Sequence, residues 1–322
     1  MASFKTSAIA LAIVGSAAAA PALAAPVASA VSVVSFENFT ISWNTLNRQV
    51  DAATDFSSLS VTSSQLTAAN MTGLTGVSDN PSSTNGASFH STSQLGSPAP
   101  GLPTSGVNNN TMAYPVPALP MVGNFSLSAS NEDGSPIKGF GVATQNHANL
   151  HNSSYASLDT LNGSAGTSSS SQLASTMFFV SAVNADSLHF AFDLGKYIGA
   201  FLSAGAFQSA SASWDVNFSL FDTTTQTSAG GFALGDSISN NAPGSGATSL
   251  GTLNSTLTGG LVDLSPFSFN SAAIRAGDRY QLTATISTRT QVERKLPEPT
   301  GIALVGLGLV ALGIARRKQK QG

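Results

Sequence analysis

The chain has 322 residues, enough for one large domain or two small ones. Apolar residues make up 42% of the sequence, so a sizeable core can form, whereas charged residues make up only 9%, against roughly 25% in ordinary globular proteins. The sequence contains no cysteine, which excludes disulfides, thiolate zinc sites and cysteine nucleophiles.

The N-terminus has the three parts of a secretory signal peptide in the right order. Lys5 supplies a positive charge, residues 8–20 are apolar, and Ala22-Leu23-Ala24 has the small-x-small pattern of a cleavage site. The apolar stretch of about 13 residues is shorter than the roughly 20 that span a bilayer, which argues against a membrane anchor. Residues 1–24 are therefore predicted to be a removable export signal, with Ala28-Ser29-Ala30 as a second cleavage option.

Alternating apolar and polar residues predict the strands of the central region. The period of two that marks half-buried strands occurs in five segments, at 31–43, 176–183, 187–194, 213–221 and 280–292. Trp43 and Trp214 lie among other large apolar residues in these segments, so core packing is favoured over sugar stacking. No amphipathic helix of convincing length occurs. The pattern predicts an all-β antiparallel sandwich, for which a jelly-roll is one arrangement.

Gly-, Ser-, Asn- and Pro-rich segments predict the connections between strands. Residues 73–123 contain several prolines, which remove backbone donors from a sheet, so this region is predicted to be rich in loops. Residues 164–171 and 240–246 are predicted to be turns. Residues 25–295 are expected to form one extracellular β-rich domain.

The histidines and acidic residues give no recognisable catalytic or metal-binding pattern. His147 and His151 are four residues apart, but no Glu follows His147 as in the His-Glu-x-x-His zinc motif, and their neighbours predict an exposed polar loop. His189 is expected on the exposed face of a strand. Glu132-Asp133-Gly134 indicates a turn, and a calcium site assembled from distant loops stays open as an alternative. No cofactor, metal or catalytic residue is therefore predicted.

The C-terminus combines three features in a fixed order. Pro297-Glu298-Pro299 is followed by an uncharged apolar block at 301–315, and then by the basic cluster Arg316-Arg317-Lys318. As a helix the block is about 22 Å long, and with the residues from Leu296 onward it reaches the roughly 30 Å of the hydrocarbon core. The positive-inside rule keeps the basic cluster in the cytoplasm, which places the Pro-Glu-Pro triplet on the outer side.

These three features resemble the PEP-CTERM sorting signal of exported bacterial proteins, a resemblance that covers about the last 25 residues. It implies that exosortase, a membrane-embedded cysteine protease, recognises Pro297-Glu298-Pro299 and removes the tail, residues 296–322. It also implies transient anchoring through a transmembrane helix at 301–315 and a final place in the cell envelope, on the outer surface or in the extracellular matrix. The sortase motif Leu-Pro-x-Thr-Gly fits less well, because Leu296 to Gly301 has one residue too many between Pro and Thr.

Removing both ends makes the chain more acidic. Its 13 basic and 16 acidic residues give a net charge of −3, whereas residues 25–296 keep 8 basic and 15 acidic residues, a net charge of −7. Such a surface repels phosphate backbones, so nucleic acid is not an expected partner. The resemblance implies a non-enzymatic protein of the biofilm or exopolysaccharide layer. A carbohydrate-binding β-sandwich is the alternative, and an extracellular hydrolase is a third hypothesis.

Overall fold

The computed structural model describes most of the central region of the chain. The described residues are 27–84, 89–98, 102, 119–121, 123–133, 149–159, 166–183, 186–202, 207–240, 245–249, 257–258, 261–262 and 264–294. The export signal with Ala22 and Ala24, the triplet Pro297-Glu298-Pro299, the apolar block 301–315 and the cluster Arg316-Arg317-Lys318 lie outside them, as does His147. Within the described residues, no helix is long and apolar enough to cross a membrane.

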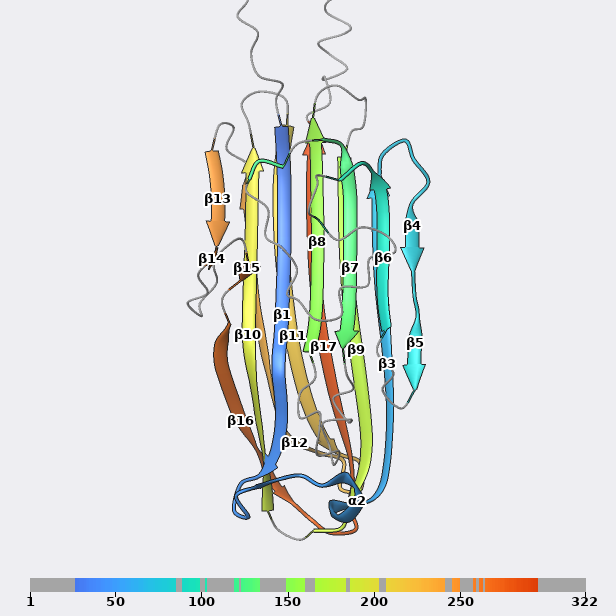
Figure 1. Ribbon diagram of the computed structural model, residues 1–322, viewed down its shortest axis with the longest axis vertical. Coiled ribbons are helices and arrows are strands. Elements are labelled where there is room, and N and C mark those ends of the chain that lie inside the picture. Colours follow the sequence, from blue (N-terminus) through green and yellow to red (C-terminus); the bar gives the residue numbers. More distant parts are fainter. Residues whose placement is uncertain are drawn as a thin grey trace, which may run out of the picture.

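Two antiparallel sheets pack face to face as a β-sandwich, which confirms the all-β antiparallel sandwich predicted for the central region (Figure 1). Sheet A has the order β13 (Ser245–Ser249), β10 (Asp186–Leu202), β1 (Val27–Trp43), β8 (Asn149–Asp159), β7 (Phe125–Asp133) and β6 (Phe89–Gly96), with β16 (Ser265–Ile274) also paired to β10 and β2 (Arg48–Gln49) to β1. Sheet B has the order β12 (Thr227–Asn240), β11 (Phe207–Asp222), β17 (Arg279–Arg294), β9 (Gly166–Ser181), β3 (Phe56–Met71) and β4 (Val77–Asp79), with β5 (Ser82–Thr84) paired to β3. A single helical turn, α2 (Ala52–Asp55), and the small hairpin of β14 (Leu257–Thr258) and β15 (Leu261–Val262) complete the described elements.

The five segments with a clear period of two all fall in strands. They belong to β1, β9, β10, β11 and β17, each 16 or 17 residues long. The segment predicted at 176–183 ends two residues early, because β9 stops at Ser181. Trp43 and Trp214 are 0% and 2% exposed, which confirms that both pack in the core. His189 is half-buried on the face opposite the buried Leu188, as the alternation predicts.

Several segments predicted to be irregular are strands instead. Residues 166–171, within a predicted turn, begin β9, and β6 lies inside the segment predicted to be rich in loops. His151, expected in an exposed polar loop, is 1% exposed in β8. The predicted turn at Glu132-Asp133 is the end of β7. Serine and asparagine fill one face of these strands, so the hydrophobic period that identifies a strand is hidden.

One half of the sandwich interior, called here the aromatic half, is filled by rings. The ring of Phe218 lies 5.3 Å from Phe36, 5.8 Å from Phe192 and 5.1 Å from Phe232, measured between centroids. A bulge at Asn38, whose φ of 55° is in the left-handed region, lets Phe36 and Phe39 both face the interior. The buried aromatic residues of this half are Phe36, Phe39, Trp43, Phe56, Phe179, Phe190, Phe192, Trp214, Phe218 and Tyr280.

The other half, called here the serine half, joins the sheets through hydroxyl and amide groups. Ser154 in β8 donates to the carbonyl of Thr288 at 3.1 Å, and Asn152 donates to the carbonyl of Ile286 at 2.7 Å. From the opposite sheet, Ser171 in β9 donates to the carbonyl of Ala129 at 3.0 Å. A one-carbon side chain that reaches a backbone carbonyl across the interface requires the two sheets to lie close together.

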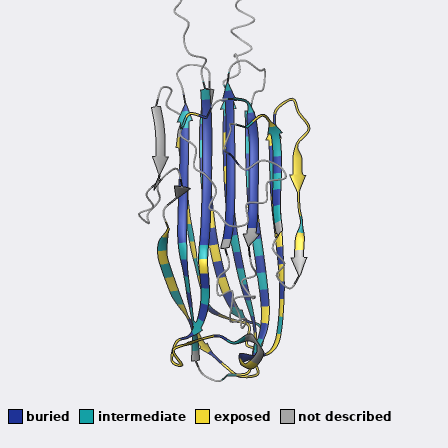
Figure 2. Cartoon of the chain, viewed as in Figure 1, coloured by how far each residue is buried: buried dark blue, intermediate teal, exposed yellow. Residues whose placement is uncertain are grey.

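In the serine half, sheet A is also covered on its outer face. Figure 2 shows the upper parts of β1, β8 and β10 as almost continuous dark blue, which means that both faces are buried there. The outer face carries a second apolar cluster of Val31, Val33, Leu102, Met121, Phe125, Leu127, Ala129, Tyr155 and Tyr197. The backbone of Met121 is held by Ser29 and Ser157, through hydrogen bonds of 3.2 and 2.8 Å. Part of the proline-rich segment is therefore a lid on sheet A.

Candidate ligand-binding face of sheet B

The outer face of sheet B displays rows of small polar side chains. In β3, β9 and β17 buried and more exposed residues alternate, so every second side chain points away from the sandwich. The register sets Thr62, Thr176, Thr283 and Ser219 side by side on four neighbouring strands. The face therefore offers hydroxyl groups at the regular spacing of the strands, about 4.8 Å apart.

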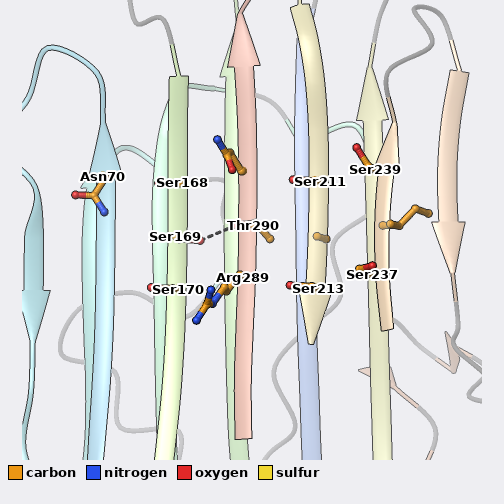
Figure 3. Close-up of a pocket in the computed structure, with 13 residues that line it drawn as sticks. Asn70, Ser168, Ser169, Ser170, Ser211, Ser213, Ser237, Ser239, Arg289 and Thr290 are labelled. Atoms are coloured by element: carbon orange, nitrogen blue, oxygen red, sulfur yellow. Dashed lines mark hydrogen bonds between the residues drawn. The ribbon is translucent and has the colours of Figure 1, made fainter. Parts of the chain in front are cut away.

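A hollow of about 430 Å³ opens in this face near the ends of β3, β9, β11, β12 and β17 (Figure 3). Two cross-strand rows line it. One row is Ser170, Arg289, Ser213 and Ser237, and the other is Ser168, Gln291, Ser211 and Ser239, with Asn70 beside Ser168. We call this the serine hollow. Its lining side chains are hydroxyl, amide and guanidinium groups, together with the apolar Ala212 and Ile238.

A second hollow of about 390 Å³ lies towards the other end of the same face. Its lining is Ser58, Leu59, Ser60, Phe178, Phe179 and Arg279. Phe178 is 38% exposed, and it is the aromatic member of the exposed large hydrophobic residues in the described chain. Ser60 lies directly opposite Phe178 on the neighbouring strand. This phenylalanine hollow therefore combines an exposed ring with hydroxyl groups and a cation.

The charges of the face are few and unevenly distributed. β3 and β9 contain no charged residue, and β17 contributes Arg279 and Arg289. Among the described residues, Arg48 and Asp55 form an ion pair. Neither Arg279 nor Arg289 is paired with a described carboxylate. The acids on this face are Asp215, which accepts from Ser287 at 3.4 Å, and Glu293, which accepts from Gln291 at 2.7 Å.

Neither hollow has the residues of a hydrolase site. Their linings contain no Asp, Glu or His, so no pair of groups is present for acid–base catalysis. Within the described part of the chain, no group of three or more His, Asp or Glu side chains is placed to hold a metal ion. Trp43 and Trp214, considered in the sequence as sugar platforms, are both in the core.

A pair of carboxylates does occur on sheet A. Glu37 and Asp193 lie directly opposite each other in β1 and β10, and burial together with Asp193 raises the pKa of Glu37. The Asn38 amide donates to Asp193 at 2.7 Å. The adjacent hollow of about 350 Å³ is lined by Asp193 and His189 but not by Glu37. The two carboxylates are therefore neighbours on the outer face of sheet A, and Asp193 is the one that borders the hollow.

Comparison of the chain with models of protein families, with curated proteins and with solved structures gave no match. Function is therefore inferred from the terminal sequence signals and from the described faces of the molecule. Sequence reasoning missed both hollows. Ser168 and Ser170 fall in the segment predicted to be a turn, and Arg289 lies on the polar side of a predicted strand, where nothing marks it as a ligand-binding residue.

Proposed function

We propose that this chain is an exported surface or extracellular-matrix protein of a bacterium, processed by an exosortase and structural in the biofilm or exopolysaccharide layer. The observation that carries the proposal is the order of the three C-terminal features: Pro297-Glu298-Pro299, the apolar block 301–315 as a transmembrane helix, and the basic cluster Arg316-Arg317-Lys318. The role is non-enzymatic, and the central domain is a sandwich with a jelly-roll as one form of its connectivity.

The bounds of the described strands suit this division of the chain. β1 begins at Val27 and β17 ends at Arg294, just inside the proposed export and sorting signals, and both points lie at the same end of the sandwich (Figure 1). Cleavage after Ala30 would remove Val27 to Ala30 from a strand that is paired on both sides, including two alanines that are fully buried. Cleavage after Ala24 leaves the strand whole, which supports the first of the two sites.

A carbohydrate-binding sandwich is the second candidate, and the outer face of sheet B favours it. The two hollows supply hydroxyl, amide and guanidinium groups, and one adds the exposed ring of Phe178. Sugars are bound by such hydrogen-bonding groups together with apolar contacts to a ring face. The two proposed functions are compatible, since a structural matrix protein could bind polysaccharide through this face.

The sorting part is tested by replacing all three residues Pro297, Glu298 and Pro299 with Ala. The change keeps the export signal and the apolar block, so the variant should still be exported but should accumulate as a longer, membrane-associated form. Wild-type protein should mature to a shorter form, and deletion of the host exosortase should reproduce the variant. Equal C-terminal masses and equal membrane fractions for wild type and variant would contradict the proposal, because a plain anchor is not processed.

A further inference from the structure

We propose that the outer face of sheet B binds a carboxylate-bearing polysaccharide, with Arg289 and Arg279 as two separate anchors. The inference rests on the proposed function, since it names the class of polysaccharide that the matrix protein would hold. The ligand runs along the strands, from the serine hollow at one end of the face to the phenylalanine hollow at the other.

The first support is the local charge, which departs from that of the whole chain. Residues 25–296 carry 15 acidic and 8 basic residues, whereas on this face the exposed Arg279 and Arg289 balance the two acids Asp215 and Glu293, and β3 and β9 contain no charge. Arg289 stands between Ser170 and Ser213 on its two neighbouring strands. The residues directly opposite Arg289 therefore carry hydroxyl groups, and Asp215, an acid of the same face, lies two positions along β11 from Ser213.

The second support is the match between the lining groups and a uronic acid unit. A guanidinium binds a carboxylate through two parallel hydrogen bonds, and serine hydroxyls both donate to and accept from sugar hydroxyls. The serine hollow has no aromatic side chain, so recognition there depends on these directional contacts. The phenylalanine hollow provides a ring contact through Phe178 next to the Arg279 charge.

The third support is the separation of the two arginines. They lie ten positions apart on one strand, β17, which corresponds to about 34 Å. Between them β17 presents the uncharged Thr283, Thr285 and Ser287, and the neighbouring strand β11 adds one carboxylate, Asp215, which accepts from Ser287 at 3.4 Å. A long polymer can reach both anchors at once and gain affinity through effective concentration, whereas a short oligosaccharide reaches one.

The experiment uses the processed protein purified from its host and measures binding by calorimetry. The probes are polygalacturonate, its fully methyl-esterified form and the trigalacturonate oligosaccharide. We expect the wild type to bind polygalacturonate at least about tenfold more tightly than the ester, because esterification removes the charge that the arginines contact. We also expect the polymer to bind more tightly, per chain, than the trisaccharide.

Variants assign the binding to the two anchors. R289Q and R279Q should each lower the affinity for polygalacturonate by about tenfold and reduce the advantage of the polymer over the trisaccharide. R289K should retain part of the affinity, since a lysine keeps the charge but not the fork of donors. R275Q is the matched control, because exposed Arg275 lies in the turn before β17, outside both hollows, and its loss changes the net charge equally.

Three results would overturn the inference: equal binding of polygalacturonate and its ester, equal losses in R289Q and R275Q, or no binding of polygalacturonate. If the ester binds as well as the acid, the face holds a neutral polysaccharide and the ligand class is wrong. If neither polymer binds while the Pro-Glu-Pro variant still fails to mature in cells, the sorting proposal stands and the polysaccharide-binding face does not.

Discussion

The two halves of the sandwich hold the sheets together through different interactions. In the aromatic half, rings from both sheets meet in the interior, as around Phe218. In the serine half, the inner faces of β7, β8 and β9 carry hydroxyl and amide groups that bond to backbone carbonyls of the opposite sheet. One pair of sheets therefore changes from an apolar to a polar interface along its length.

β7 shows how the polar interface is compatible with a stable sheet. Ser126 and Ser128 face sheet B and donate to the carbonyls of Ser168 and Ala68, at 2.6 and 3.1 Å. Phe125 and Leu127 face the other way, into the cluster covered by Leu102 and Met121. The alternation is thus inverted, with the apolar side outside the sandwich. In this half the outer cluster of sheet A therefore adds apolar burial to that of the inner side chains such as Leu158, Ile198 and Val292.

The two interfaces differ in how much free energy they contribute to folding and in how strictly they fix the relative position of the sheets. Burial of a phenylalanine side chain stabilises by roughly 1.5–3 kcal/mol without strict direction. A hydrogen bond contributes a net of about 0.5–1.5 kcal/mol, but leaving one partner buried and unsatisfied costs about 1–3 kcal/mol. The aromatic half should therefore supply most of the stability, whereas the serine half should fix how the sheets align.

The largest expected effect is that of Phe218→Ala in the aromatic half. Phe218 is 2% exposed and contacts rings from β1, β10, β12 and β16, so the change leaves a large cavity. We expect a loss of about 3–5 kcal/mol in the free energy of unfolding, measured by denaturant titration. Phe178→Ala is the control, because that ring is 38% exposed, and it should cost clearly less. Equal losses of stability in Phe218→Ala and Phe178→Ala would contradict the prediction that the buried aromatic cluster supplies most of the stability.

The next effect is acid destabilisation of the serine half through His151. Burial lowers the pKa of His151 to about 4 from an ordinary value of 6.5, and its Nδ1 lies 3.2 Å from the Ser35 hydroxyl. The unfolded chain therefore binds a proton between pH 6.5 and 4 that the folded chain does not. The contribution of neutral His151 to the free energy of unfolding should be fully present above pH 6.5. This contribution should decrease by about 3 kcal/mol as the pH drops to about 4.

The variant H151Q separates this effect from other acid titrations. Gln carries no titrating group, so the fall between pH 6.5 and 4 should be reduced in the variant. Asp55 is buried, which opposes its ionisation, but hydrogen bonds from Arg48, the Asp51 amide and Trp43 outweigh burial and lower its pKa. Its contribution is therefore lost below the ordinary pKa of 3.8, outside the His151 window. An unchanged profile in H151Q, measured by thermal unfolding, would contradict the assignment.

Lys196 lies where the two halves meet, and its replacement should have a smaller effect of opposite sign. Its side chain is fully buried on the inner face of β10, with the amine 5.1 Å from the centroid of Trp214 and without a hydrogen-bond partner in the described chain. Burial lowers the pKa of the amine, and Asp236 partly opposes this. Because a buried charge with incomplete pairing is costly, Lys196→Met should raise stability by about 1–2 kcal/mol.

The control for this prediction is Lys196→Ala, which removes the charge but leaves a cavity. It should be less stable than Lys196→Met, as measured by denaturant titration of both variants beside the wild type. If Lys196→Met is markedly destabilised, the amine makes a stabilising interaction that outweighs its desolvation.

The contrast between the halves also explains what the sequence could and could not predict. Residues 187–194 and 213–221 contribute to the aromatic half, and their apolar side chains reveal the strand period directly. Ser171 occupies an inward position that apolar residues usually fill, so its segment reads as a turn. Ser126 and Ser128 also point inward, but they alternate with Phe125 and Leu127, so the period of two is visible in that segment although it is not among the five predicted strands. Composition cannot distinguish a serine in a loop from a serine bonded across two sheets, because the difference lies in a tertiary contact.

The candidate ligand-binding face was predictable only in part. The threonines of β17 follow from the alternation in the predicted strand 280–292, but the neighbours of Arg289 depend on strand register. Ser213 and Ser170 are 43 residues apart in sequence and meet on either side of that arginine. Pairing between distant strands is set by the packing of the whole domain, which a local pattern does not encode. The terminal signals stay predictions.

The smallest expected effect is the coupling between two hydroxyl groups in the serine half, and it tests whether this interface is cooperative. Ser154 donates to the Thr288 carbonyl at 3.1 Å, and the two hydroxyl oxygens lie 2.9 Å apart. Ser154→Ala and Thr288→Val each remove one buried hydroxyl and leave its partner unsatisfied, so each should cost about 1–2 kcal/mol. The double variant removes both groups together and should cost less than the sum, by about 0.5–1 kcal/mol.

Thr285→Val is the matched control, because this threonine is on the same strand but on the outer face of sheet B, and its replacement should change stability by less than about 0.5 kcal/mol. Additive losses in the double-variant cycle would mean that the two hydroxyls act independently. In that case each hydroxyl in the serine half would contribute to stability by itself, and the serine half would differ from the aromatic half only in contributing less. Coupling would instead show that its stability depends on matched positions of the two sheets, since a shift of one residue would separate every such pair at once.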